Sequence, residues 1–222
     1  MLRMSQYALS VRRKNVNGSL TLQRSTGTII ELSFRLLGRT IPVDHGYALY
    51  AALSRVVPEL HDAQEVGIPP VRGVYAGGGV LHLAPFSRLT IRLPHDQIRS
   101  VLKLAGKTVD VASHTLHIGI PNARALLPVA NLRARLVTIK GFLEAEPFAE
   151  AAKRQLHSLG IAGELLLGTR RTLRIKDKQV VGFDAVITEL TAEESLILQE
   201  RGLGGRRRMG CGVFVPTEVN SR

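Results

Sequence analysis

Two kinds of residue in this sequence suit chemistry on a phosphate ester. Residues 202–212 hold five glycines and three adjacent arginines. Glycine lets backbone N–H groups approach an anion, and arginine presents a fixed fork of donors that fits phosphate. The sequence also has seven histidines, and the unperturbed pKa of histidine, about 6.5, suits proton transfer at neutral pH. The residues expected to bind phosphate are Gly204, Gly205, Arg206, Arg207, Arg208, Gly210 and Gly212.

This glycine-rich segment does not match a nucleotide triphosphatase. Gly205 and Gly210 have the spacing of a P-loop, but Cys211 and Gly212 stand where that motif requires lysine and serine or threonine. The order of elements also differs, because the segment follows a predicted helix and precedes a predicted strand. A loop that only exposes a solvated charge cluster is the alternative interpretation.

His45 has the best position for proton transfer. It follows Asp44, a good N-cap candidate for a helix over residues 44–60, and the positive end of a helix disfavours a charged imidazolium. A neutral base is therefore expected at His45, with a packing role as the alternative. His61, beside Asp62 near the other end of this helix, is the second candidate. Interaction with the helix C-terminus is the alternative role of His61.

A second group of cations surrounds a predicted tight turn at Asp177. In a hairpin, such a group forms a compact positive surface that suits phosphates or the groove of a hairpin RNA. Lys140, at the end of an upstream strand, is expected to join this surface, although a solvated face is the alternative. The cations of the hairpin are Arg170, Arg171, Arg174, Lys176 and Lys178.

The composition favours a nucleic-acid partner and excludes several protein classes. The 222 residues carry a formal net charge of +12, and residues 1–27 contribute five cations and no acid as a flexible basic leader. No apolar run approaches the roughly 18 residues of a membrane span. The single cysteine, Cys211, excludes a disulfide framework and a multi-thiolate zinc site. We expect a cytoplasmic protein without a metal, a cofactor or a membrane partner.

Aromatic residues limit how a nucleic acid would be bound. The chain has no tryptophan, and phenylalanine and tyrosine make up only 5% of it. A sequence reader built on stacked bases is therefore disfavoured, and contact with the backbone and shape of a stem-loop is favoured. Tyr47 and Tyr50 are expected on the exposed side of the helix over 44–60, where they either contact a base or pack against a second domain.

The elements that must position these residues recur in two halves. Alternating apolar residues predict strands over 29–37 and 132–138, and helical spacing predicts helices near 95–105 and 147–159. A further helix is expected from the capping box at Thr191 to a stop at Gly202. Both halves fit the order β-α-β-β-α-β, which is ferredoxin-like.

We therefore predict an α+β protein with two tandem ferredoxin-like, RRM-like domains. The N-terminal domain is expected at residues 28–119 and the C-terminal domain, with the glycine-rich loop, at 132–216. A connecting stretch is expected at about 120–131.

Three motifs resemble one known family. Residues 202–216, GLGGRRRMGCGVFVP, are similar to the signature loop of CRISPR-associated repeat-RNA endoribonucleases, which belong to the RAMP superfamily. Residues 42–50, PVDHGYALY, and 140–142, KGF, resemble the myxobacterial-type subgroup of that family. The resemblance covers about residues 28–216 and leaves out the leader.

The resemblance implies a function and a site. It implies two ferredoxin-like domains and metal-independent cleavage of precursor CRISPR RNA within repeats, by attack of the 2′-hydroxyl and with retention of the product. It assigns catalysis to His45, assisted by Tyr47. The implied partner is CRISPR repeat RNA, as a stem-loop or single strand, with other effector-complex subunits as further partners and no need for DNA. The alternatives are a non-catalytic RAMP subunit that binds guide RNA and an unrelated ferredoxin-like ligand-binding or regulatory domain.

Overall fold

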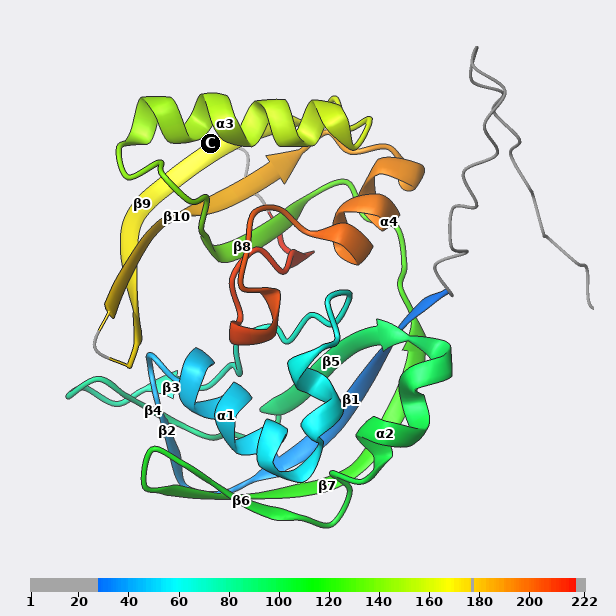
Figure 1. Cartoon of the computed structure of the whole chain (residues 1–222), viewed down its shortest axis with the longest axis vertical. Helices are drawn as coiled ribbons and strands as arrows, with labels where there is room; N and C mark the ends of the chain where they lie inside the picture. Colours follow the sequence, from blue (N-terminus) through cyan, green and yellow to red (C-terminus); the bar gives the residue numbers. More distant parts are fainter. Residues whose placement is uncertain (1–27, 177, 219–222) are drawn as a thin grey trace, which may run out of the picture.

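The computed structural model describes residues 28–176 and 178–218, and it builds them into two units, each with a four-stranded sheet and two helices (Figure 1). The predicted leader, residues 1–27, lies outside the described residues. No helix in the described ranges is long and apolar enough to cross a membrane.

The N-terminal unit is built on the antiparallel sheet β5-β1-β7-β6, and its helices cover one face of that sheet. The chain order is β1, α1, β5, α2, β6 and β7, so the hairpin β6–β7 comes last instead of preceding the second helix. The elements of this sheet and its helices are β1 (Ile29–Leu37), α1 (Gly46–Val56), β5 (Arg88–Pro94), α2 (Ile98–Leu102), β6 (Thr108–Val111) and β7 (His114–Ala125).

A small three-stranded sheet lies between β1 and β5 in the chain. Its strand order is β2-β4-β3, with β2 (Thr40–Pro42), β3 (Val74–Tyr75) and β4 (Val80–His82). These short strands form a sheet of their own and do not join the four-stranded one. Two 3₁₀ helices complete the unit: η1 (Pro58–His61) after α1 and η2 (His95–Gln97) before α2.

The C-terminal unit follows the predicted β-α-β-β-α-β order, and its sheet order is β11-β8-β10-β9. The first strand is second from one edge in both units, so the two sheets share one spatial arrangement. The elements are β8 (Leu132–Val137), α3 (Ala145–Ser158), β9 (Glu164–Ile175), β10 (Lys178–Thr188), α4 (Ala192–Arg201), η3 (Arg207–Met209) and β11 (Val215–Pro216).

Local signals explain the ends of the best-predicted helix. The Thr191 side chain accepts from the Glu194 N–H, and the Glu194 carboxylate accepts from Thr191 N–H, which completes the predicted capping box of α4. Gly202 ends α4 at a φ of 64°, a conformation that a residue with a Cβ rarely adopts.

Three expectations about boundaries are wrong. Asp44 does not cap α1: the N-cap is His45, without a side-chain hydrogen bond, and Asp44 Oδ2 instead accepts the N–H of Arg174 on β9 at 2.8 Å. Residues 120–125 are not a connection, because they extend β7 and pair with β1 as far as Ile30↔Ala125. The helix expected over 95–105 is a 3₁₀ turn followed by only five α-helical residues.

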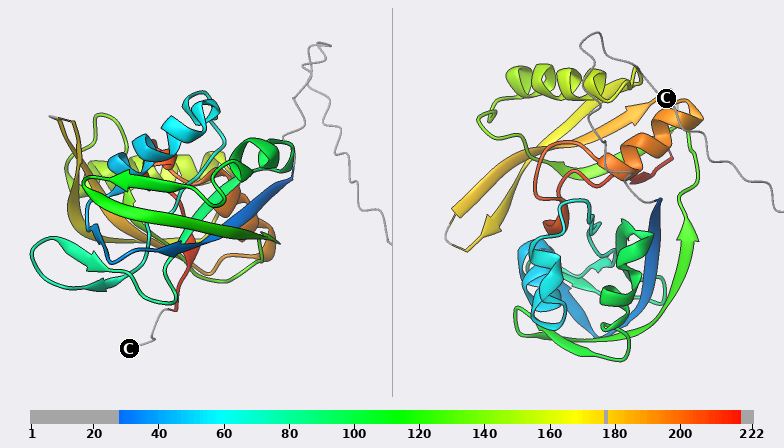
Figure 2. Two further views of the ribbon diagram at one scale, coloured as in Figure 1. Left: turned by 90° about the horizontal axis from the view of Figure 1, so that it is seen from below. Right: turned by 45° about the vertical axis from the view of Figure 1, so that its right-hand side comes forward.

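Each unit buries its own apolar cluster, and the segment 202–212 lies between the two units (Figures 1 and 2). Arg92 on β5 reaches across this junction. Its side chain is 1% exposed, and it donates from Nε to Glu31 at 3.0 Å and from Nη1 to the backbone carbonyls of Gln199 and Phe214. The two units are therefore joined by buried polar contacts as well as by the glycine-rich loop.

Candidate functional site

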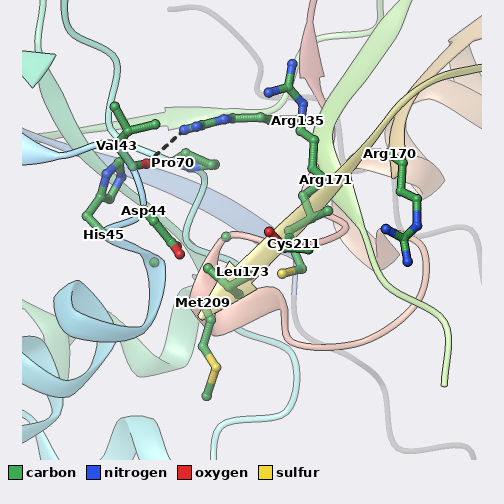
Figure 3. Close-up of a pocket in the computed structure, with 14 residues that line it drawn as sticks. Val43, Asp44, His45, Pro70, Arg135, Arg170, Arg171, Leu173, Met209 and Cys211 are labelled. Atoms are coloured by element: carbon green, nitrogen blue, oxygen red, sulfur yellow. Dashed lines mark hydrogen bonds between the residues drawn. The ribbon is translucent and has the colours of Figure 1, made fainter. Parts of the chain in front are cut away.

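A pocket of about 420 Å³ lies at the junction of the two units (Figure 3). The start of α1 forms one wall, strands β8 and β9 form the opposite wall, and the glycine-rich loop closes one side. The residues lining it are Val43, Asp44, His45, Gly46, Pro70, Arg135, Leu136, Arg170, Arg171, Thr172, Leu173, Met209, Gly210 and Cys211.

Three arginines make this pocket electropositive. Arg170 and Arg171 are exposed on β9, and Arg171 lies 3.7 Å from the buried Asp184 carboxylate. Arg135 on β8 is half-buried and points toward the start of α1, where its Nη1 donates to the Val43 carbonyl at 3.1 Å (Figure 3). Burial, and then the nearby charge of Arg171, lower the pKa of Arg135. An anion in the pocket would offset this repulsion.

Sequence reasoning did not include Arg135 among the binding residues. Alternation of apolar residues predicts the strand over 132–138 that carries Arg135. Whether such a residue faces solvent or a second unit depends on which surfaces dock, and alternation does not contain that information.

His45 is buried inside the N-terminal unit, with 1% of its surface exposed. Its Nδ1 donates to the Pro42 carbonyl at 2.7 Å, and its Nε2 accepts the Val71 N–H at 2.9 Å. Burial is the main cause that lowers its pKa to about 4, against a hydrogen bond to Pro42 that opposes the shift. His45 is thus neutral, as expected, but neither ring nitrogen is open to a substrate in this conformation.

The two tyrosines of α1 differ in exposure. Tyr47, the expected assistant of His45, is half-buried one residue after the start of the helix. Tyr50 is 7% exposed and packs in the core of the N-terminal unit, so the expectation that it is exposed is wrong.

His61 belongs to a cluster at the far end of α1. The Tyr50 hydroxyl lies 3.0 Å from His61 Nδ1, and the two rings meet edge to face. Arg208, from the glycine-rich loop, lies 5.5 Å over the Tyr50 ring and donates from Nη1 to the carbonyls of Leu60 and His61. His61 is exposed, and within the described chain no hydrogen bond occupies its Nε2.

The two candidate histidines lie beyond opposite ends of α1, and only His61 is exposed. They flank α1, whose 11 residues correspond to about 16 Å at 1.5 Å per residue. A group that transfers a proton to a reacting atom must lie within hydrogen-bond reach of it. The structure therefore separates the two hypotheses, and substitution of each histidine tests them independently.

Glycine residues allow the backbone of the loop to pack closely, both within the loop and against α1. A Cβ on Gly46 of α1 would lie 2.2 Å from the Met209 carbonyl oxygen, and one on Gly212 would lie 1.9 Å from that of Leu203. The N–H of Gly205 donates to the carbonyl of Thr138, the residue after β8, at 2.9 Å, and that of Gly212 donates to the Leu136 carbonyl of β8 at 2.7 Å. The N–H groups of Gly204 and Gly210 donate to the Gln155 side chain and the Arg207 carbonyl. The expectation that these four N–H groups cradle phosphate is not met in this conformation.

The three adjacent arginines have three environments. Arg206 is exposed, near the Thr138 hydroxyl. Arg207 is half-buried and donates to the Glu200 carbonyl, and burial lowers its pKa to about 10. Arg208 is half-buried in the His61 cluster. Only Arg206 presents the open cation that the sequence led us to expect of all three.

The basic hairpin β9–β10 is present as predicted, with Asp177 at its tip outside the described residues. Its cations are all exposed, as is Lys140 after β8. Arg171 and Leu173 face the pocket side, whereas Arg174 is fixed near the start of α1 through its N–H contact with Asp44. The hairpin therefore extends the positive surface of the pocket outward.

Metal-ligating side chains do not gather among residues 28–176 and 178–218: no group of three histidine, cysteine, aspartate or glutamate residues there could hold an ion. Cys211 is fully buried beside the pocket, and burial raises its pKa to about 12. Its thiol is therefore protonated and is not a nucleophile at neutral pH.

Comparison with known proteins identifies the family. Residues 30–219 match the family model described as Cas6 CRISPR. A CRISPR-associated endonuclease Cas6 from Myxococcus xanthus (strain DK1622) is 41% identical over 187 residues, which cover 84% of this chain and 81% of that protein. The chain belongs to the Cas6 family.

Solved structures of Cas6 proteins share this fold. A CRISPR-associated protein Cas6 superposes with a TM-score of 0.59 at 15% identity, covering 86% of this chain and 99% of the other. A Cas6-related protein from Pyrococcus furiosus also gives 0.59, at 12% identity, covering 84% of this chain and 98% of the other. The predicted resemblance and the predicted pair of ferredoxin-like units are therefore confirmed. The residues matched by the Cas6 model include His45, His61 and the whole glycine-rich loop.

Proposed function

We propose that this Cas6 protein is a metal-independent endoribonuclease that cleaves precursor CRISPR RNA within its repeats and retains the product. The main observation behind this proposal is the exposed His61, which contacts Tyr50 in a cluster that also contains Arg208. This cluster and a cationic pocket both lie at the junction of the two units. The endonuclease name of the Myxococcus xanthus relative supports the activity. We further propose that the protein acts in the cytoplasm, where its RNA substrate is made.

The reaction that suits these groups is attack of a 2′-oxygen on the adjacent phosphorus. The new P–O bond forms a cyclic phosphate, and the bond to the 5′-oxygen of the next nucleotide breaks. The proton must leave the 2′-hydroxyl, a proton must reach the departing 5′-oxygen, and a cation must stabilise the charge of the phosphorane. One imidazole can take the proton from the 2′-hydroxyl and then give it to the 5′-oxygen. A guanidinium can stabilise the phosphorane, so that no metal ion is needed.

His61 suits the proton transfer better than His45. Its Nδ1 is oriented by the Tyr50 hydroxyl, and we assign contact with the substrate to Nε2, for which no hydrogen bond is found within the described residues. Arg208 uses Nη1 for the carbonyls of Leu60 and His61, and its other N–H groups can stabilise charge on the phosphorane. His45 and Tyr47 remain the alternative pair, and their use requires the contacts of His45 with Pro42 and Val71 to open.

The RNA is proposed to follow the positive surface that leads from the hairpin into the junction. Arg170 and Arg171 contact phosphates at the pocket, and Arg206 and Lys140 extend the path along the C-terminal unit. The cations nearer the tip of the β9–β10 hairpin bind the phosphates of the stem or strand farther from the pocket. These cations are Arg174, Lys176 and Lys178. Such contacts read charge and shape rather than sequence.

The test is cleavage of the repeat RNA from the genome that encodes this chain, in EDTA. We expect full activity of the wild type, and a loss of about 10²- to 10⁴-fold in the single-turnover rate of His61→Ala with unchanged RNA affinity, because general acid–base catalysis contributes about that much. Tyr50→Phe keeps the buried ring and removes only the hydroxyl, so it is the matched control for the orientation of His61.

Three outcomes would contradict the proposal. A requirement for Mg²⁺ would exclude the metal-free mechanism. Full activity of His61→Ala, with loss in a folded His45→Ala protein, would move the reaction to the start of α1. Tight, salt-sensitive RNA binding without cleavage by the wild type would instead identify a non-catalytic guide-RNA-binding subunit.

A further inference from the structure

The aromatic side chains that the structure leaves exposed are gathered in one segment. Among the phenylalanine and tyrosine residues that the structure describes, two are exposed: Tyr75, with an exposed fraction of 66%, and Phe86, with 55%. Val74, next to Tyr75, is 55% exposed as well. Single exposed apolar residues are ordinary, but a group of large ones marks a binding surface. Because the chain has so few aromatic residues, two exposed ones in the same segment indicate a binding surface.

Tyr75 lies on a hairpin that is tied to the pocket. Strand β3 pairs with β4 at Tyr75↔Leu81, and β4 pairs with β2 at Ile41↔Leu81. The chain leaves β2 directly into Val43, whose N–H donates to the Gly79 carbonyl at the end of this hairpin at 2.8 Å. Val43 is also the residue that Arg135 contacts in the pocket (Figure 3). The tip of the hairpin is therefore tied to the rim of the cationic pocket.

The loop that carries Phe86 is fixed to the base of the same hairpin. Ser87 Oγ donates to the Arg72 carbonyl at 2.7 Å and accepts the Ala84 N–H at 2.9 Å. In Figure 1, β3 and β4 project at the same side of the molecule as the tip of the basic hairpin β9–β10, and the left view of Figure 2 also places both on one side.

Charge distinguishes a nucleic-acid ligand from a protein ligand here. Residues 66–95 contain three arginines and no aspartate or glutamate. Two of these arginines, Arg72 and Arg88, are exposed. A mixed-charge rim is usual around an apolar protein interface, whereas exposed aromatic side chains beside cations and without acids in the same segment favour binding of single-stranded nucleic acid.

We propose that Tyr75 stacks on an unpaired base of the repeat RNA, in the strand that flanks the part held by the pocket and the basic hairpin, with Phe86 as a second stacking surface. Residues 77–79 form the tip of the hairpin and are all glycine, so no side chain there obstructs a base beside Tyr75. The scarcity of aromatic residues limits stacking to one or two bases, and the rest of the RNA is bound through its backbone. This inference rests on the proposed RNA-processing function.

The experiment measures equilibrium binding of two forms of the repeat RNA, one with its single-stranded flanks and one trimmed to the stem-loop. Tyr75→Ala should weaken binding of the flanked RNA by roughly 5- to 100-fold, the equivalent of one stacked base. It should not weaken binding of the trimmed RNA. Tyr75→Phe keeps the ring and should bind both forms as the wild type does. A 2-aminopurine placed in the flank should be quenched by the wild type and by Tyr75→Phe, but not by Tyr75→Ala.

Salt dependence separates stacking from charge contacts. Tyr75→Ala should leave the slope of log affinity against log salt unchanged, whereas Arg171→Ala should reduce its magnitude by about 0.7 to 0.9. If Tyr75→Ala binds the flanked RNA as tightly as the wild type while Arg171→Ala weakens it and His61→Ala loses cleavage, the processing function stands and the stacking inference is wrong. The exposed aromatics would then mark a protein-docking surface. If the wild type neither binds nor cleaves repeat RNA, the proposed function fails first.

Discussion

His45 links the end of β2 to the stretch before β3 through both of its ring nitrogens. The carbonyl of Pro42 accepts from one nitrogen, and the other accepts the N–H of Val71, a residue in a buried stretch between η1 and β3. A buried donor or acceptor without a partner costs about 1–3 kcal/mol. His45 therefore contributes to the stability of the rim on which the start of α1 and the β3–β4 hairpin rest.

The buried imidazole predicts a specific dependence of stability on pH. The pKa of His45 is about 4 in the folded protein, below the 6.5 or so of an exposed histidine, so the unfolded chain binds a proton more readily between these values. The stability that His45 contributes is complete above about pH 6.5 and is lost as the pH falls toward 4, to a total on the order of 3 kcal/mol. Urea unfolding at a series of pH values measures this loss.

The matched control is His45→Gln, which keeps polar atoms at this site but does not titrate there. We expect the stability of this variant to be lower at pH 7 and to change less between pH 6.5 and 4 than that of the wild type. Parallel curves for the two proteins would show that another group causes the acid sensitivity.

Burial is the property that residue types could not reveal. From the sequence, His45 and His61 were separated only by their positions on one helix, and the prediction of a neutral His45 agrees with its low pKa. The contacts of its two nitrogens come from Pro42 and Val71. The second of these lies 26 residues away, and no local pattern predicts such a contact.

At the scale of elements, the backbone of α1 comes close to the backbone of the glycine-rich loop at Gly46. We predict that Gly46→Ala destabilises the protein by about 1–3 kcal/mol, as overpacking usually does, although alanine favours a helix. The cause is the 2.2 Å approach of the new Cβ to the Met209 carbonyl oxygen. Thermal or urea unfolding measures the change.

Gly205→Ala is the matched control for this prediction. Gly205 lies in the same loop, a Cβ there would meet no atom within 4 Å, and it is not among the glycines with positive φ. Its substitution should change the free energy of unfolding by less than about 0.5 kcal/mol. Equal effects of the two substitutions would mean that the α1–loop contact does not limit stability.

The glycine-rich loop also explains why three neighbouring arginines do not form one surface. Arg207 and Arg208 begin a 3₁₀ turn, in which successive side chains point about 120° apart at three residues per turn. One therefore reaches α4, the next reaches η1, and Arg206 before the turn stays in solvent. The sequence shows that the three arginines are adjacent, but the backbone conformation determines whether their side chains lie on one surface.

At the scale of the whole molecule, Arg92 joins the units. It shares the buried Glu31 carboxylate with Arg124 and also holds carbonyls at the end of α4 and at Phe214, just before β11. We predict that Arg92→Ala lowers the free energy of unfolding by about 3–5 kcal/mol, because loss of one partner leaves a buried charge and buried carbonyls poorly paired. Urea unfolding, followed by probes in each unit, measures the loss and shows whether the units still unfold together.

An exposed ion pair provides the comparison for Arg92. Lys103 and Glu59 lie 2.6 Å apart with about half of each side chain exposed, and such pairs contribute little to stability. Lys103→Ala should therefore leave the unfolding midpoint nearly unchanged. A similar effect of both substitutions would contradict the role of Arg92 as the link between the units.

The two-unit architecture was predictable because each half has its own apolar periodicity and its own stop signals. The C-terminal order β-α-β-β-α-β followed from the strand at 132–137, the helix that ends before Gly160 and the capping box at Thr191. In the N-terminal half the same signals located the strands but not their partners, because alternation does not specify pairing. Strands β3 and β4 form a separate sheet with β2, and the hairpin β6–β7, which follows α2 in the chain, completes the main sheet.

The single thiol of the chain has a use that follows from its position. Cys211 is fully buried where the loop, β8 and β9 meet, and a buried, protonated thiol reacts only after it becomes accessible. The rate at which a thiol reagent modifies the native protein therefore reports how often the glycine-rich loop separates from β8 and β9. The natural cysteine can thus serve as a probe of this opening, without an introduced label.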